Sequence, residues 1–322
     1  MRCASCGIAE NDETKLKRCA ACQSARYCSI SCQKDHRSKH KNLCKKRATE
    51  IREEILFRQP ESTHQGDCPI CLLPLSLDHD DSTMMGCCSK VICDGCQLAN
   101  RLRELEGMQE PKCPFCRHPA PKTDEEADLN RERRVEANDP VATREKGAVC
   151  YENGDYGSAF QCWTKASKLG DAEAHYRMAK LYRDGEGVEK DSKKEWRHLE
   201  EAAIGGHPAA RHNLGVREGG KGRIERAKKH FIIAANLGND ESIEALKGGY
   251  VKGFVRKEEL GAAIRAYQAA KDEAKSPQRD EAEEFQRNPI PELDFSTESA
   301  WVNYATAPAA TAPTAKMSSK KR

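Results

Sequence analysis

The sequence lacks long hydrophobic runs and is poor in aromatic residues. Of its 322 residues, 6% are aromatic and 38% hydrophobic, whereas 33% are charged, and the mean hydropathy is −0.82. Because this composition argues against one large sheet-based core, helices, small metal-held modules and disordered tails are the structures to consider. No stretch approaches the roughly 18 consecutive apolar residues of a membrane-spanning helix, so we expect no membrane association.

The first residues, Met1 to Cys6, also lack the apolar run of a secretory signal. We therefore expect an intracellular protein, cytoplasmic or nuclear. Cysteine is scarce in the C-terminal two thirds, since fifteen of the seventeen cysteines lie between Cys3 and Cys116. In a reducing compartment, such crowding favours thiolates bound to metal ions over disulfides.

The formal net charge of +3 counts every cysteine as neutral. Fifteen thiolates (−15) and four divalent ions (+8) would change this +3 to −4, so the apparent basicity is no argument for nucleic-acid binding. The basic stretch 39–47 is more often a solvated face than a contact with DNA. We therefore expect no nucleic-acid partner.

The first cysteine cluster contains four pairs of potential metal ligands. A two-residue gap lets one tight turn present both sulfurs to an ion, and a three-residue gap places two ligands on one face of a helical turn. Eight ligands in this arrangement predict two tetrahedral zinc sites. The pairs are Cys3 and Cys6, Cys19 and Cys22, Cys28 and Cys32, and His40 and Cys44.

This spacing resembles the MYND zinc finger over residues 3–44, including the segments 27–29 (Tyr-Cys-Ser) and 32–34 (Cys-Gln-Lys). The spacing alone also permits His36 as a ligand, but the family pattern selects His40. The resemblance implies two interleaved sites, one formed by Cys3, Cys6, Cys28 and Cys32 and the other by Cys19, Cys22, His40 and Cys44.

The same resemblance implies capture of short proline-rich peptides, with Gln33 as a contact. However, Arg37 stands where such modules carry a tryptophan. A folded zinc module with another contact surface is the alternative interpretation.

The second cysteine cluster carries three CxxC pairs and one adjacent pair, and it resembles a RING finger in an all-cysteine form. Lys90 occupies the position of the usual histidine, and His79 is an alternative ligand. The resemblance implies a cross-brace in which Cys68, Cys71, Cys93 and Cys96 bind one ion and Cys87, Cys88, Cys113 and Cys116 the other. With the first cluster, this predicts about four Zn²⁺ ions, two per finger.

RING fingers of ubiquitin ligases dock a ubiquitin-conjugating enzyme and perform no covalent chemistry themselves. The resemblance implies three contact residues: Ile70 in the first knuckle, Pro114 in the last, and Arg117 just after the final ligand. The alternatives are that Ile70 packs inside the module and that Arg117 is a solvated charge. The aromatic residue that often lines the docking groove is absent from 97–102.

The rest of the chain repeats itself with a period that is typical of stacked helical hairpins. Gly170, Gly206 and Gly238 follow similar helical segments, and each can end a helix in the left-handed conformation. Residues 178–203 resemble a Sel-1-like repeat, which implies an α-solenoid over about 139–275 and a concave protein-binding surface. No nucleophile–base pair is recognisable here, so no catalytic residue is predicted.

We therefore predict a mainly α protein, an α-solenoid of Sel-1-like hairpins preceded by two small zinc-stabilised modules, MYND and a RING cross-brace. The expected boundaries are a MYND finger at 1–46, a charged linker at 47–67, a RING-type finger at 68–117, a charged helical linker at 118–138, repeats at 139–275 and a disordered tail at 276–322.

The leading functional hypothesis is a zinc-dependent adaptor that acts as a RING-type ubiquitin ligase. Its RING would recruit a conjugating enzyme, while the repeats and the MYND finger hold an unknown target protein. The alternative is a non-catalytic interaction scaffold whose zinc fingers are purely structural. A lysine methyltransferase is set aside, because the sequence has no cofactor-binding glycine motif.

Overall fold

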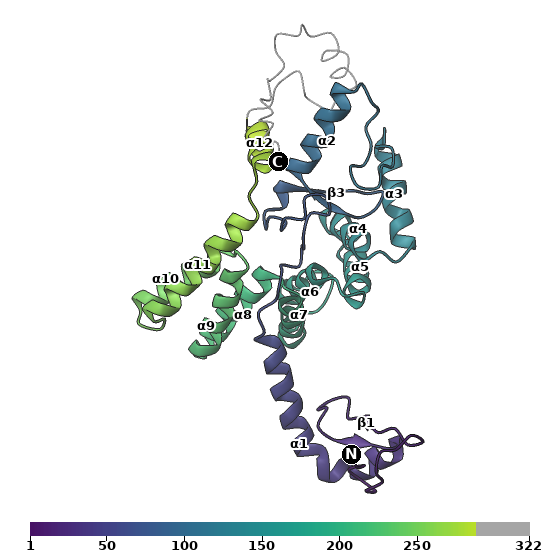
Figure 1. Ribbon diagram of the computed structural model, residues 1–322, viewed down its shortest axis with the longest axis vertical. Helices are drawn as coiled ribbons and strands as arrows, with labels where there is room; N and C mark the ends of the chain where they lie inside the picture. Colours follow the sequence, from purple (N-terminus) through teal and green to yellow (C-terminus); the bar gives the residue numbers. More distant parts are fainter. Residues whose placement is uncertain (288–322) are drawn as a thin grey trace, which may run out of the picture.

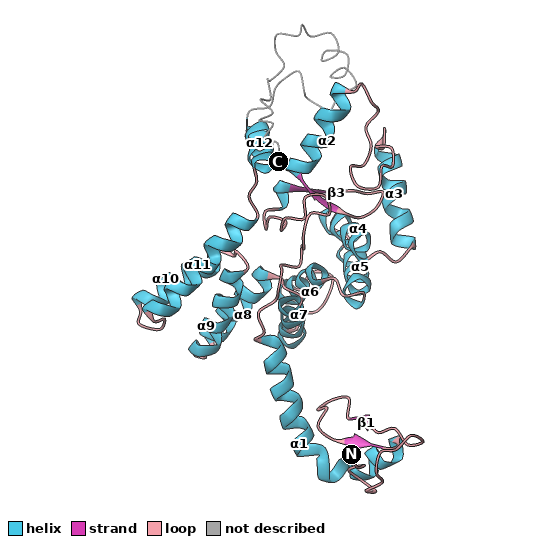
Figure 2. Cartoon of the chain, viewed as in Figure 1, coloured by secondary structure: helices cyan, strands magenta, loops and turns pink. Residues whose placement is uncertain are grey.

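The computed structural model describes residues 1–287, apart from the side chain of His79. The described part is mainly helical (Figure 2), as predicted, with short two-stranded sheets in the two cysteine-rich modules. None of the helices in this part of the chain is long and apolar enough to cross a membrane.

The first module consists of a small hairpin, β1 (Lys17–Arg18) and β2 (Arg26–Tyr27), followed by α1 (Ile30–Leu56). The side chain of Ser29 caps α1 by accepting a hydrogen bond from the backbone N–H of Cys32 at 3.1 Å. Helix α1 has 27 residues and runs without a break to Leu56, so it extends from the first module into the charged linker expected at 47–67. This helix holds the first module away from the repeats (Figure 1).

The second module is a hairpin and one helix. A single 3₁₀ turn, His79–Asp81, precedes β3 (Ser82–Met84), which pairs antiparallel with β4 (Val91–Cys93). Helix α2 (Asp94–Glu106) follows β4 directly. Helix α3 (Asp124–Glu136) occupies the expected charged helical linker and packs on the first repeat.

The repeats form four consecutive helical hairpins that stack side by side (Figure 1). The predicted helix ends are confirmed, since Gly170, Gly206 and Gly238 all have positive φ, between 82° and 91°. The alanines just before each of these turns are fully buried, which lets neighbouring helices approach closely. The hairpins are α4 (Pro140–Glu152) with α5 (Tyr156–Lys168), α6 (Ala172–Asp184) with α7 (Ser192–Ile204), α8 (Pro208–Gly220) with α9 (Ile224–Asn236), and α10 (Asp240–Val251) with α11 (Lys257–Glu273).

One boundary needs correction. Residues assigned to a disordered tail from 276 onward instead begin with α12 (Pro277–Arg287), which packs against α2 of the second module. The composition suggested disorder because α12 is polar, with Ala282 as its one buried residue. The helix is held by contacts with a distant part of the chain, which local composition does not reveal. The remaining predicted tail, 288–322, lies outside the described residues.

The C-terminal end of α1 is docked on the repeats. Arg211, which is fully buried, donates hydrogen bonds to the carbonyl oxygens of Leu56, the last residue of α1, and Ala203, in the last turn of α7. On α1 itself, Arg52 forms an ion pair with Glu200 at 2.8 Å. These contacts fix the direction in which α1 leaves the solenoid.

Candidate metal centres

Four CxxC knuckles share one turn geometry. In each of them, the residue after the second cysteine has a positive φ, and its N–H donates to the carbonyl oxygen of the first cysteine at 2.8–3.0 Å. The tight turn aims both sulfur atoms to the same side. The turns are Cys3–Gly7, Cys19–Gln23, Cys68–Leu72 and Cys113–Arg117.

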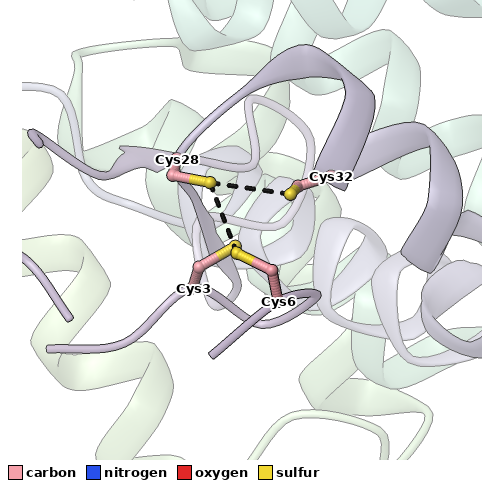
Figure 3. A group of neighbouring side chains, drawn as sticks. All are labelled: Cys3, Cys6, Cys28 and Cys32. Carbon is pink, nitrogen blue, oxygen red and sulfur yellow. Dashed lines mark hydrogen bonds between the residues drawn. The ribbon is translucent and has the colours of Figure 1, made fainter. Parts of the chain in front are cut away.

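The first module brings together one group of four cysteines. The Sγ atoms of Cys3, Cys6, Cys28 and Cys32 all lie within 4.8 Å of one another. Cys28 Sγ is 3.5 Å from both Cys6 Sγ and Cys32 Sγ (Figure 3). Four sulfur donors at this separation fit a tetrahedral Zn²⁺ site.

The second group of the first module combines cysteine with histidine. Cys22 Sγ lies 3.2 Å from His40 Nε2, and Cys19 Sγ and Cys44 Sγ complete a set within 4.8 Å. His36, which the spacing also permitted, is outside this set, since its Nδ1 is hydrogen-bonded to the hydroxyl of Tyr27 at 3.1 Å. The structure therefore places His40 rather than His36 among the sulfurs.

Hydrogen bonds within these groups shift the pKa values of individual thiols in opposite directions. Hydrogen bonds from the backbone of Cys6 and Cys28 lower the pKa of Cys3 to about 6. Hydrogen bonds with the thiols of Cys6 and Cys32 raise the pKa of Cys28 to about 12. A divalent cation binds thiolates, so its binding would release the protons that remain on the high-pKa members.

The second module brings together two all-cysteine groups, each within 4.8 Å: Cys68, Cys71, Cys93 and Cys96, and Cys87, Cys88, Cys113 and Cys116. The groups alternate along the chain, which is the order of a cross-brace. The side chain of His79, the alternative ligand, lies outside the described residues.

The adjacent pair Cys87 and Cys88 has a structural explanation that sequence reasoning missed. Residues 85–89 form the same turn as the CxxC knuckles, with Ser89 at a φ of 57° and its N–H donating to the Met85 carbonyl oxygen at 2.7 Å. Met85 stands where a knuckle carries its first cysteine, and Cys88 stands at the second position. Cys87 supplies the other sulfur from inside the turn, 3.4 Å from Cys116 Sγ. The sequence signal for this turn was the spacing Met85-x2-Cys88, which equals the spacing of the two cysteines in a CxxC knuckle.

The three predicted conjugating-enzyme contacts all lie on knuckle turns. Ile70 is 41% exposed, Pro114 is half-buried, and Arg117 is exposed. The guanidinium of Arg117 donates a hydrogen bond to Asn100 Oδ1 on α2 at 3.0 Å. Ile70 is thus available on the surface rather than packed inside the module.

In the first module, Gln33 and Arg37 are both exposed on α1. The amide nitrogen of Gln33 lies 3.8 Å from Cys19 Sγ. Gln33 therefore lies next to the Cys19 group, and a peptide that contacts Gln33 would bind beside that group.

A further buried cluster joins the segment before the second module to the repeats. Glu173 Oε2 is 2.7 Å from His207 Nε2 and 3.4 Å from His64 Nε2. The two imidazole rings are stacked, with centroids 4.1 Å apart and planes at 11°. Because the lone pair of an imidazole nitrogen lies in the ring plane, two stacked rings cannot both direct one at the same ion. His207 Nδ1 also accepts the N–H of Ala210, which leaves Nε2–H to donate to Glu173. We therefore interpret the His64–Glu173–His207 cluster as a hydrogen-bonded contact between this segment and the repeats, and not as a metal site.

The geometry defines a class of protein: cysteine-rich modules, with donor sets suited to zinc, attached to a helical-repeat solenoid. Comparisons with known families agree. The family model "MYND finger" matches residues 3–44, and the family model "Sel1 repeat" matches 147–171, 172–207 and 208–239. These matches leave 68–117 uncovered. The chain therefore carries a MYND finger and Sel1 repeats.

Individual relatives match only in part. The chain is 34% identical over 108 residues to chitin synthase regulatory factor 4 of Schizosaccharomyces pombe, a match that spans 31% of this chain and 17% of that protein. The crystal structure of a Sel1 repeat protein from Oxalobacter formigenes is 26% identical, with a TM-score of 0.39, over 48% of this chain and 64% of that one. A protective antigen of uropathogenic Escherichia coli with an SLR fold is 21% identical, with a TM-score of 0.37, over 52% of this chain and 37% of that one.

Proposed function

We propose that this protein is a zinc-dependent adaptor of the ubiquitin system. In this proposal, the second module is a RING-type finger that binds two zinc ions and docks a ubiquitin-conjugating enzyme. The MYND finger binds two more zinc ions and, together with the Sel1 repeats, holds the target protein. The observation that carries the proposal is the alternation of the two all-cysteine groups, which gives the cross-brace order of a RING.

The surface of the second module supports a docking role. Ile70 and Phe115 are 41% and 43% exposed on the first and last knuckles. A cavity of about 620 Å³ lies beside the last knuckle, lined by Leu98, Asn100 and Pro114 and by residues of α3 and α12. Apolar residues next to a hollow of this kind are suited to receiving side chains from a partner. Ile70 does not line this cavity, so it would contact the partner at a separate point.

Catalysis by such a module consists of positioning. The conjugating enzyme carries ubiquitin as a thioester, and the finger restricts its motion so that the attacking lysine finds it in a reactive pose. Arg117 is suited to bridging two proteins, because its planar guanidinium can donate to carbonyl oxygens on each. It would first have to exchange its present hydrogen bond to Asn100.

The test is ubiquitin transfer by the purified full-length protein, with activating enzyme, ubiquitin and a panel of conjugating enzymes. We expect ubiquitin chains with the parent and loss of most chain formation with Ile70→Ala. Ile8→Ala is the matched control, because Ile8 is an apolar residue directly after the first knuckle of the other finger and is 51% exposed. If no conjugating enzyme supports transfer, or if Ile70→Ala equals the parent while both retain zinc, the ligase proposal is wrong.

One observation favours the second candidate, a non-catalytic scaffold. Asn100 occupies the face of α2 beside the last knuckle, where docking grooves often carry an aromatic residue, and it engages Arg117. The scaffold interpretation expects no ubiquitin transfer but stable complexes that are captured through the repeats. The same assay therefore separates the two candidates.

A further inference from the structure

The last described helix packs on one of the candidate metal groups of the second module. Arg279 of α12 places its Nη2 atom 3.5 Å from Cys71 Sγ and 3.2 Å from the carbonyl oxygen of Leu73. Its Nη1 atom donates to the carbonyl oxygens of Pro74 and Ala274, each at 2.6 Å. One guanidinium therefore joins the end of the solenoid, the first knuckle and a metal-ligand sulfur.

The module also has a backbone feature that α12 requires. A Cβ atom on Gly95, which lies between Cys93 and Cys96, would come within 2.8 Å of the backbone nitrogen of Arg279. Gly95 is in the first turn of α2, where alanine is otherwise well tolerated. The absence of a side chain here lets the backbone of α12 approach the second knuckle of the same metal group.

The far end of α12 is tied to that knuckle as well. Gln286 Nε2 donates to Asp94 Oδ2 at 2.6 Å, while Thr83 donates to the other carboxylate oxygen at 3.2 Å. Ala282, midway between Arg279 and Gln286, is buried. The face of α12 at positions 279, 282 and 286 is thus the one that packs on the module, as expected for helical spacing.

The chemistry of a four-cysteine zinc site explains why a cation belongs at this place. Four thiolates around one divalent ion leave a net negative charge, and hydrogen bonds or cations next to the sulfurs stabilise it. In the described residues, Arg279 brings a full positive charge to Cys71 from more than 200 residues away in sequence.

We propose that α12 completes the Cys68–Cys71–Cys93–Cys96 site, with Arg279 as a positioning residue that stabilises the bound thiolates. This inference rests on the proposed zinc ion at that group. It follows that zinc binding at this site and docking of α12 are thermodynamically coupled: loss of the ion weakens the docking, and undocking α12 weakens the hold on the ion by the same factor. The end of the solenoid is thereby fastened to the second module through a metal site.

The experiment measures zinc release from the full-length protein into a chelating dye, ion by ion, for the parent and three variants. Arg279→Met should release one zinc ion faster by about 10-fold or more, which is the usual effect of losing an outer-shell partner. Gly95→Ala should do the same, although it keeps every ligand and the arginine. Arg279→Lys, which retains the charge but not the planar fork, should be intermediate.

Arg287→Met is the matched control, because Arg287 lies on the same helix, is exposed, and pairs with Glu283 one turn away on that helix. Hydrogen exchange of 277–287 in the same variants supplies a second readout, and protection should fall in Arg279→Met and Gly95→Ala. The inference is overturned if both variants lose this protection but release zinc at the parent's rate, or if release and protection are both unchanged. Absence of zinc from this group in the parent protein, measured by native mass spectrometry, would instead overturn the proposed site itself.

Discussion

Replacing His230 should stabilise the protein at neutral pH and should stabilise it further in mild acid. His230 of α9 is fully buried, and within residues 1–287 neither of its ring nitrogens has a hydrogen-bond partner. Its ring lies against that of Phe57, just after α1, with centroids 4.7 Å apart. Burial, together with the nearby guanidinium groups of Arg211 and Arg226, lowers the pKa of His230 from 6.5 to about 3.

The sign of the pH effect follows from this lowered pKa. Because the folded state disfavours the proton, the stability that depends on neutral His230 is fully present above pH 6.5 and is lost as the pH falls from 6.5 toward 3. A pKa difference of one corresponds to about 1.4 kcal/mol, so the full loss is on the order of 5 kcal/mol, with about 2 kcal/mol of it reached by pH 5.

His230→Leu removes both the unpaired nitrogens and the titration. At pH 7.5 we expect the variant to be more stable than the parent by about 1–3 kcal/mol, the cost of burying polar atoms without partners. Between pH 7.5 and pH 5, this advantage should grow by about 2 kcal/mol.

Urea denaturation of the full-length protein, followed by tryptophan fluorescence at each pH, measures the free energy of unfolding. The parent and the variant keep the same zinc ligands. Acid effects on the metal sites therefore cancel when the free energies of unfolding of the two proteins are subtracted at each pH. His118→Leu, which changes an exposed histidine, is the control. A His230→Leu protein that is less stable than the parent at pH 7.5, or an advantage that stays constant down to pH 5, would refute the reasoning.

Three further predictions concern the metal groups, the His64–Glu173–His207 cluster and the repeats. Cys88→Ser should remove one zinc ion per chain in native mass spectrometry while leaving the others bound; an unchanged metal content would place the fourth ligand elsewhere. Glu173→Leu should leave the Nε2–H of His207 buried without its acceptor and cost about 1–3 kcal/mol of stability, with hydrogen exchange rising first in 57–67. Glu173→Gln, which keeps an acceptor, should be much milder. Gly147→Ala places a Cβ atom 2.6 Å from Trp163 Nε1 and should lower the thermal midpoint, at a cost of about 1–3 kcal/mol for overpacking; a rise would show that α4 can shift.

Much of the architecture was predictable because local spacing determines it. The helix ends at Gly170, Gly206 and Gly238 follow from residues that are close together in sequence, and the structure confirms them. The ligand groups were expected from CxxC spacing and from family resemblance, and the structure brings the same residues together. A tight turn needs only five residues to direct two sulfurs, so distant parts of the chain have little influence on it.

The parts that sequence reasoning missed depend on contacts between distant segments. Arg211 reaches the end of α1 from 155 residues away, and Arg279 reaches Cys71 from 208 residues away. No local pattern distinguishes such an arginine from a solvated one, which is why α12 was assigned to a disordered tail and 47–67 was described only as a charged linker. The turn at Met85–Ser89 is different, because it is a local feature. It was missed because Met85 takes the place of the first cysteine, so the segment does not show a CxxC pattern.

The central claim is that zinc ions stabilise the fold of each of the two small modules. Native mass spectrometry of the purified full-length protein tests it most directly. We expect four zinc ions per chain. Their removal by a chelator should abolish order in 3–44 and 68–117, while the repeats and the end of α1 that is docked on them stay folded. A chain without zinc whose cysteines are joined as disulfides, or one that keeps both modules ordered after complete removal of the metal, would contradict the account.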